Sequence, residues 1–73
     1  MVNYMVICDG SRIRTEPSVN STATGMFFDG DIIYDASYPF ENEGKLWVSF
    51  KDSNGNWRYL CSYDGNEALL SYI

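Results

Sequence analysis

The sequence predicts an all-β protein, folded as a small closed barrel of five to seven short antiparallel strands. Short runs of aromatic and β-branched residues alternate with polar residues, as they do in half-buried strands. Gly, Asn, Asp, Ser or Pro separates nearly every pair of runs, and no window repeats with the 3.6-residue period of a helix. A chain of 73 residues can form only a small barrel, and closure removes exposed sheet edges.

Seven segments have the composition of strands. The predicted strands are residues 4–8, 12–15, 25–28, 31–35, 46–50, 57–62 and 69–73. We interpret residues 39–44 as a longer connection between two strands. A turn of helix around residues 66–70 is the only helical element we consider, and it is too short to be stable alone. No linker or internal repeat divides the chain, so we treat residues 1–73 as one domain.

The segments at 46–50 and 57–62 form the clearest hairpin. The loop between them, residues 52–56, is polar, and the pair Asn54-Gly55 suits the positive φ angles that hairpin loops require. Alternation places Trp47 on the face opposite Val48, and Tyr59 on the face opposite Leu60. We expect one face of the hairpin to belong to the core and the other to meet a ligand.

The charge balance excludes several classes of partner. The formal net charge is −5 and the five basic residues are scattered, so no basic stripe can neutralise nucleic-acid phosphates or anionic lipids. The longest apolar run, residues 4–8, is far shorter than the ~20 residues of a membrane span, and the N-terminus lacks the pattern of a signal peptide. We expect no nucleic acid and no membrane among the partners, and neutral or amine-bearing ligands suit the acidity best.

The residues on which most enzymes depend are missing. The chain has no histidine, the commonest general base and nucleophile activator. The loop at 52–56 resembles a calcium loop only superficially, because Trp57 and Tyr63 stand where that loop requires glycine and glutamate. We therefore expect no catalysis, no cofactor and no metal. We interpret Cys8 and Cys61 as small buried hydrophobic residues, with a single disulfide as the alternative.

Aromatic residues are more numerous than so small a barrel can bury. The chain holds four Phe, six Tyr and two Trp residues, and we expect roughly half of the rings to lie on the surface. Exposed Tyr and Trp are typical of recognition sites. Tyr34, Tyr38 and Tyr59 are candidates for ligand binding, because they lie near loop boundaries or opposite the predicted core. The predicted core includes Ile33, Val48, Phe50 and Leu60.

Two further residues have more than one interpretation. Trp47 either packs beneath a long loop or offers a platform to a ligand. Arg14 either pins a loop to a carboxylate or contacts the ligand.

Four segments resemble one protein family. Residues 11–18 (SRIRTEPS) and 25–34 (GMFFDGDIIY) are similar to the opening of bacterial SH3 (SH3b) domains. Residues 45–50 (KLWVSF) and 53–60 (SNGNWRYL) are similar to a later segment of the subtype found in phage endolysins and lysostaphin-like cell-wall-targeting proteins. The resemblance covers residues 4–63. It implies a small SH3-like barrel that binds the peptide part of peptidoglycan, often its cross-bridge, without catalysis of its own.

The resemblance also implies groove residues. Tyr59 matches an aromatic residue that lines the ligand groove of relatives, and Tyr38 matches a second groove position. Ala36 stands where lysostaphin-like members carry an acidic groove residue, which argues against specificity for glycine bridges. The relatives' N-terminal extension is reduced to residues 1–4, where Tyr4 is the one candidate. The candidate ligand-binding residues are therefore Tyr59, Tyr38, Tyr34, Trp47, Tyr4 and Arg14.

Together, these features predict a non-catalytic module that targets a lytic enzyme, such as a phage endolysin, to the extracellular face of the Gram-positive cell wall. Its expected partners are a peptidoglycan stem peptide or cross-bridge and a catalytic lysin domain in the same or an associated chain, and a homo-oligomer stays open. Tethering would raise the effective concentration of the hydrolase at its substrate. The alternative is an SH3-like interaction module for extended or proline-rich peptides, although the ALYDY signature of eukaryotic SH3 domains is absent.

Overall fold

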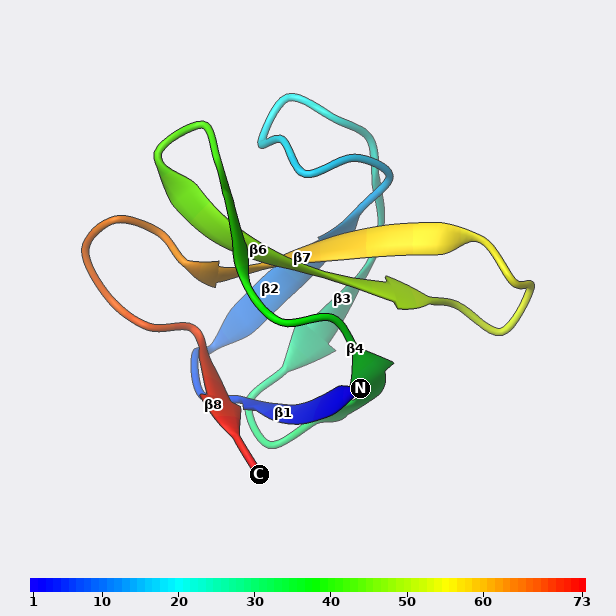
Figure 1. Cartoon of the computed structure of the whole chain (residues 1–73), viewed down its shortest axis with the longest axis horizontal. Coiled ribbons are helices and arrows are strands. Elements are labelled where there is room, and N and C mark those ends of the chain that lie inside the picture. Colours follow the sequence, from blue (N-terminus) through cyan, green and yellow to red (C-terminus); the bar gives the residue numbers. More distant parts are fainter.

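The computed structural model describes residues 1–73, which form eight antiparallel strands in two sheets. The strands are β1 (Val2–Val6), β2 (Gly10–Arg14), β3 (Ala23–Phe28), β4 (Ile32–Ala36), β5 (Phe40–Asn42), β6 (Lys45–Lys51), β7 (Trp57–Tyr63) and β8 (Leu70–Tyr72). Their orders are β4-β1-β8 and β3-β2-β7-β6-β5. Figure 1 shows the long β6–β7 hairpin extending across the molecule, with β1, β4 and β8 gathered below it. The predicted all-β fold is confirmed, and no helix has the length and hydrophobicity that a membrane span requires.

The β6–β7 hairpin forms where the sequence predicts it. Val48 pairs with Leu60 and Ser49 with Tyr59 across the two strands. The Asp52 side chain organises the loop, because its Oδ1 accepts hydrogen bonds from the backbone N–H groups of Asn54 and Asn56, both at 2.9 Å. Gly55 has a φ of 80°, whereas Asn54 is not among the residues with positive φ, so glycine alone supplies the left-handed conformation.

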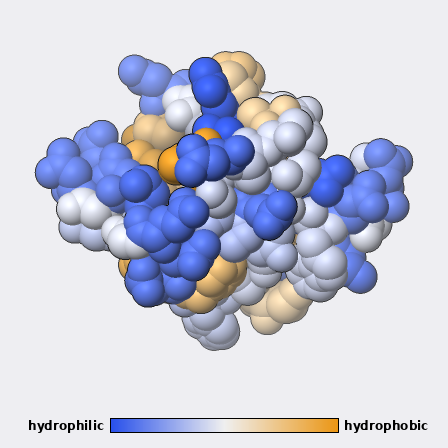
Figure 2. All heavy atoms as spheres, turned by 90° about the horizontal axis from the view of Figure 1, so that it is seen from above, coloured by the Kyte–Doolittle hydropathy of each residue, from blue (hydrophilic) through white to orange (hydrophobic).

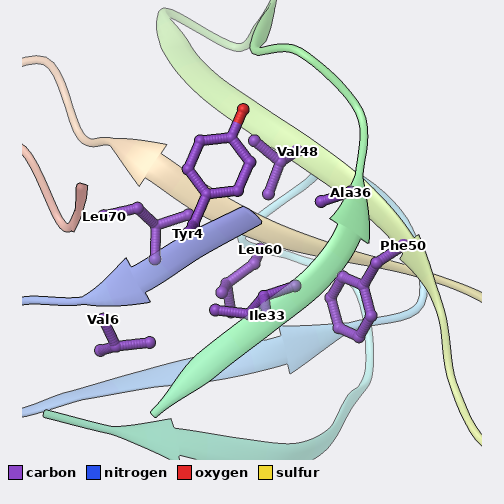
Figure 3. Close-up of a cluster of buried hydrophobic side chains, with 8 residues drawn as sticks. All are labelled: Tyr4, Val6, Ile33, Ala36, Val48, Phe50, Leu60 and Leu70. Atoms are coloured by element: carbon purple, nitrogen blue, oxygen red, sulfur yellow. The ribbon is translucent and has the colours of Figure 1, made fainter. Parts of the chain in front are cut away.

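The core lies between the two sheets. Figure 3 shows side chains from β1, β4, β6, β7 and β8 converging on it. Its eight residues are Tyr4, Val6, Ile33, Ala36, Val48, Phe50, Leu60 and Leu70. All four residues predicted for the core belong to this set. Tyr4 extends the core toward the surface, since its ring lies inside and its hydroxyl points away from the cluster.

Two local predictions are wrong. The connection at 39–44 contains β5, which pairs with β6 through Phe40 and Trp47, so the strands number eight rather than five to seven. Residues 66–70 form no helical turn. Instead, Asp64 Oδ1 accepts hydrogen bonds from the N–H groups of Asn66 and Glu67, both at 2.8 Å, and this bend leads into β8.

The two cysteines are free thiols, and both are half-buried. Cys8 packs against the main core, as a small hydrophobic residue would. Cys61 lies on β7, in a different sheet from β1, and no disulfide joins it to Cys8.

Candidate functional site

The residues opposite the core on the β6–β7 hairpin form the candidate binding surface. The core residues of this hairpin point into the barrel, so their neighbours along each strand point the other way. Pairing across the hairpin then places Ser49 beside Tyr59 and Lys51 beside Trp57. We call these four residues, Ser49, Lys51, Trp57 and Tyr59, the hairpin outer face.

Tyr59 lies at the centre of the hairpin outer face. Its ring meets Phe40 of β5 edge to face, with centroids 6.2 Å apart and an interplanar angle of 86°. Its backbone pairs with Ser49 on one side and with Arg14 of β2 on the other. Tyr59 is therefore half-buried and held on both sides, with part of its surface in solvent.

Arg14 fixes the loop that borders this surface. Its Nη1 donates a hydrogen bond of 2.7 Å to the carbonyl oxygen of Ser21, in the loop between β2 and β3. The same loop binds the β5–β6 turn, where Ser18 Oγ donates to a Glu43 carboxylate oxygen at 2.9 Å. Arg14 therefore pins a loop, as one of its two interpretations proposed, but through a backbone carbonyl rather than a carboxylate.

Tyr38 lies near Ser49, along the same edge of β6 that pairs with Phe40 of β5. The preceding residue, Ser37, donates its N–H to Ser49 O at 2.9 Å and accepts the Ser49 N–H on its Oγ at 2.9 Å. These two bonds attach the segment after β4 to the hairpin. Tyr38 itself is 71% exposed, so most of its ring is available to a ligand.

Two of the predicted ligand-binding residues are buried instead. Trp47 is 1% exposed and Tyr4 is 2% exposed, so neither ring can offer a face to a ligand. Trp47 pairs with Phe40 of β5, and its Nε1–H donates a hydrogen bond of 2.9 Å to Asn42 O. Strand alternation places the Trp47 side chain on the outer side of the hairpin, but β5 and the turn after it cover that side chain. Tyr4 lies on β1, which is paired on both edges, by β4 and β8. We remove both residues from the site, and Trp47 has the packing role.

The hydroxyl of Tyr4 is held in a group of tyrosines. It donates to Ser37 O at 2.8 Å, and its ring lies 5.1 Å from that of Tyr72. Burial, with Tyr72 and Tyr38 nearby, raises the pKa of Tyr4 to about 12.

The stability of the domain is expected to fall between about pH 10 and about pH 12. Unfolded tyrosine has a pKa of about 10, so the folded state holds the Tyr4 proton more tightly. Its contribution to stability is complete below about pH 10 and is lost as the pH rises through the folded pKa. Thermal unfolding at about pH 9 and about pH 11 measures this loss. Tyr4→Phe should show a smaller difference between the two conditions, and an equal difference would contradict the role of Tyr4.

A concave region adjoins the hairpin outer face at Trp57. Met1, Tyr34, Asp35, Lys51 and Trp57 line a cavity of about 560 Å³. Trp57 is 49% exposed and Tyr34 67% exposed. The Lys51 ammonium lies 5.1 Å from the centre of the Trp57 ring, a cation–π contact. Trp57 was missing from the predicted set, although its alternation with Arg58 already placed it on the outer side.

The surplus of aromatic side chains exists, but it is dispersed. Six of the rings are exposed: Phe28, Tyr34, Tyr38, Trp57, Tyr63 and Tyr72. Phe28 lies on β3, away from the hairpin outer face. Figure 2 shows one side of the molecule, where hydrophilic residues cover both ends and hydrophobic residues form small separate patches. The candidate site is thus a set of separate rings around Ser49 and Tyr59, with a cavity at one end, and not one continuous aromatic trough.

The ionisable groups with shifted pKa values have structural roles. The backbone N–H of Asn56 lowers the pKa of Asp52, and the backbone N–H of Glu67 lowers the pKa of Asp64. Both shifts favour the charged carboxylate, which is the form that accepts the hydrogen bonds of each turn. Burial raises the pKa of the Cys61 thiol and so disfavours the nucleophilic thiolate. No three His, Cys, Asp or Glu side chains gather into a group that could hold a metal ion.

The fold and the outer face define a small β-barrel whose exposed groups suit binding. A family model described as the bacterial SH3 domain matches residues 3–61, which is most of the chain. The chain therefore belongs to the bacterial SH3 domain family, whose members are in general non-catalytic binding modules. Searches of curated proteins and of solved structures found no significant match.

Proposed function

We propose that this domain binds the peptide part of peptidoglycan on the hairpin outer face and thereby targets a lytic enzyme, such as a phage endolysin, to the Gram-positive cell wall. The observation that carries the proposal is the position of Tyr59 in a bacterial SH3 domain. Its ring is fixed by Phe40 on a surface opposite the core, and Tyr38 and Trp57 are exposed nearby.

The outer face suits a narrow, flexible and amide-rich ligand. Ring surfaces can pack against the Cα and methyl groups of a peptide, while tyrosine hydroxyls bond its amides. The β2–β3 loop beside Tyr59 is already held by the bonds of Arg14 and Glu43. Such preorganisation reduces the entropy lost on binding.

The charge of the domain selects among wall components. With a net charge of −5, the domain repels polyanions such as teichoic acids and attracts peptides that carry free amines. Ala36 carries no charge and is fully buried, so it cannot serve as an acidic groove residue for a glycine bridge. A stem peptide or an amine-bearing bridge is therefore the proposed ligand.

The benefit to a lytic enzyme comes from attachment. A domain that holds its partner hydrolase on the wall raises the effective concentration of that hydrolase at its substrate. This role requires no catalytic group in the domain itself. It places the site of action at the extracellular face of the wall, with the catalytic domain in the same or an associated chain.

Sedimentation with purified cell walls tests the proposal. The labelled domain should sediment with protein-stripped walls from at least one Gram-positive genus. Removal of teichoic acids should leave binding unchanged or stronger, because an anionic polymer would be lost. Digestion of the wall peptides should abolish binding. If the domain stays in the supernatant with walls of every genus, the proposal is overturned.

A further inference from the structure

A second concave site lies at the open end of the barrel, beside the β6–β7 loop. This barrel-end cavity has a volume of about 550 Å³, within the usual range for small-molecule sites. Five apolar side chains contribute to its lining: Ile13, Phe27, Ile32, Ile33 and Phe50. The rings of Phe27 and Phe50 are in contact there, with centroids 5.7 Å apart. The cavity thus offers an apolar floor to a ligand.

The rim of the barrel-end cavity is cationic, although the protein is acidic. Lys51 and Arg58, two of only five basic residues, line it, and Asp52 is its only acidic residue. Lys51 is engaged with the Trp57 ring and has no carboxylate partner. The local charge therefore favours an anion, in contrast to the rest of the surface.

The Arg58 side chain makes only one hydrogen bond within the protein. Its Nη1 donates to Trp57 O at 2.9 Å, but its Nε is shielded from solvent and has no hydrogen-bond partner. The nearest carboxylate oxygen, Asp52 Oδ2, lies 3.5 Å from Nε, which is longer than a good charge-assisted hydrogen bond. The other oxygen of Asp52 is occupied by the loop N–H groups of Asn54 and Asn56. Asp52 thus stabilises the β6–β7 loop through its hydrogen bonds and only partly neutralises the Arg58 guanidinium.

We propose that the barrel-end cavity binds the carboxyl-terminal residue of a peptide with an aliphatic side chain. The side chain packs on the apolar floor, and the carboxylate pairs with the guanidinium of Arg58, which suits planar carboxylates, while Lys51 adds a second positive charge. A purely apolar ligand would not pair with either Lys51 or Arg58. A small inorganic anion would leave the apolar floor of the cavity exposed to water. The inference does not rest on wall binding, because it requires neither Tyr59 nor Tyr38, although Tyr34 and Lys51 line both this cavity and the one beside Trp57.

Titration with N-acetyl-leucine, followed by NMR of the isotope-labelled domain, tests the proposal. Saturable shifts are expected at Ile13, Ile33 and the Arg58 Nε–H, with a Kd on the order of millimolar for so small a ligand. N-acetyl-leucinamide, which lacks the carboxylate, should bind at least about tenfold more weakly. Arg58→Gln should weaken binding of the acid to a similar extent, and Arg12→Gln, at an exposed position of β2, should not.

Two results would overturn the proposal. One is the absence of saturable shifts at the cavity, and the other is equal binding of the acid and the amide. If Arg58→Gln fails to fold, Lys51→Gln replaces it, and unchanged affinity for the acid in that variant counts against the proposed charge recognition. Wall sedimentation of a folded Arg58→Gln domain should be unchanged, which separates this site from the hairpin outer face.

Discussion

Trp47→Ala is expected to destabilise the domain by about 3–5 kcal/mol, the usual cost of deleting a buried tryptophan side chain. Trp47 is 1% exposed, and its removal leaves both a cavity and an unpaired carbonyl at Asn42. A domain of 73 residues has a free energy of unfolding of about 4–11 kcal/mol, so the variant loses a large part of its stability. We expect the Tm to fall by about 12 °C or more, as measured by circular dichroism.

Trp57→Ala is the matched control for this experiment. Trp57 lies on the same side of the same hairpin, but it is 49% exposed. Its loss removes mainly the contact with Lys51, so the free energy of unfolding should change by less than about 1 kcal/mol. Similar Tm values for the two variants would contradict the difference in burial that separates Trp47 from the hairpin outer face.

The contrast between these two tryptophans shows what strand alternation can predict. Alternation placed both residues on the side opposite Val48 and Leu60, and the register of β6 and β7 confirms that placement. Whether such a side is buried depends on what covers it. Trp47 is covered because β5 pairs with β6. This pairing involves only three residue pairs, so β5 is too short for its sequence to show a recognisable strand alternation.

Local signals predicted the elements whose causes are local. The β6–β7 hairpin formed around Gly55 and a run of polar loop residues, and the predicted core residues of that hairpin are buried because their period matches the pleat. The suspected helical turn failed for an equally local reason. A carboxylate at Asp64 offers the next N–H groups an alternative to helical hydrogen bonds, and such competition is typical of aspartate.

The candidate site was less predictable, because its members come together through tertiary pairing. Tyr34, Tyr38 and Tyr59 are at least partly exposed, and their role in binding stays a prediction. Tyr4 was a candidate only because it lies near the N-terminus, but pairing of β1 with both β4 and β8 buries it. The barrel-end cavity joins residues of β2, β3, β4, β6 and β7, so only the folded arrangement reveals it.

Tyr59→Ala is expected to weaken wall binding by at least about tenfold. Aromatic residues at the centre of an interface commonly cost about 2 kcal/mol or more when truncated, which is about 30-fold in Kd. Tyr59 is central to the hairpin outer face, and its ring is oriented by Phe40, so little freedom is lost when a ligand packs on it. Binding isotherms with purified walls, measured well below the Tm, give the ratio of the two Kd values.

Stability and position must be controlled in this comparison. Tyr59 is half-buried, so its truncation also removes the edge-to-face contact with Phe40, worth about 0.5–1.5 kcal/mol of stability. Tyr38→Ala avoids that cost, because Tyr38 is 71% exposed, and it should weaken binding with little change in Tm. Phe28→Ala removes a ring that is 57% exposed on β3 and should leave binding intact. If the ligand lies on the hairpin outer face, Tyr59→Ala and Tyr38→Ala should bind walls more weakly than Phe28→Ala. Equal binding by all three variants and the unaltered domain would show that another surface binds the wall.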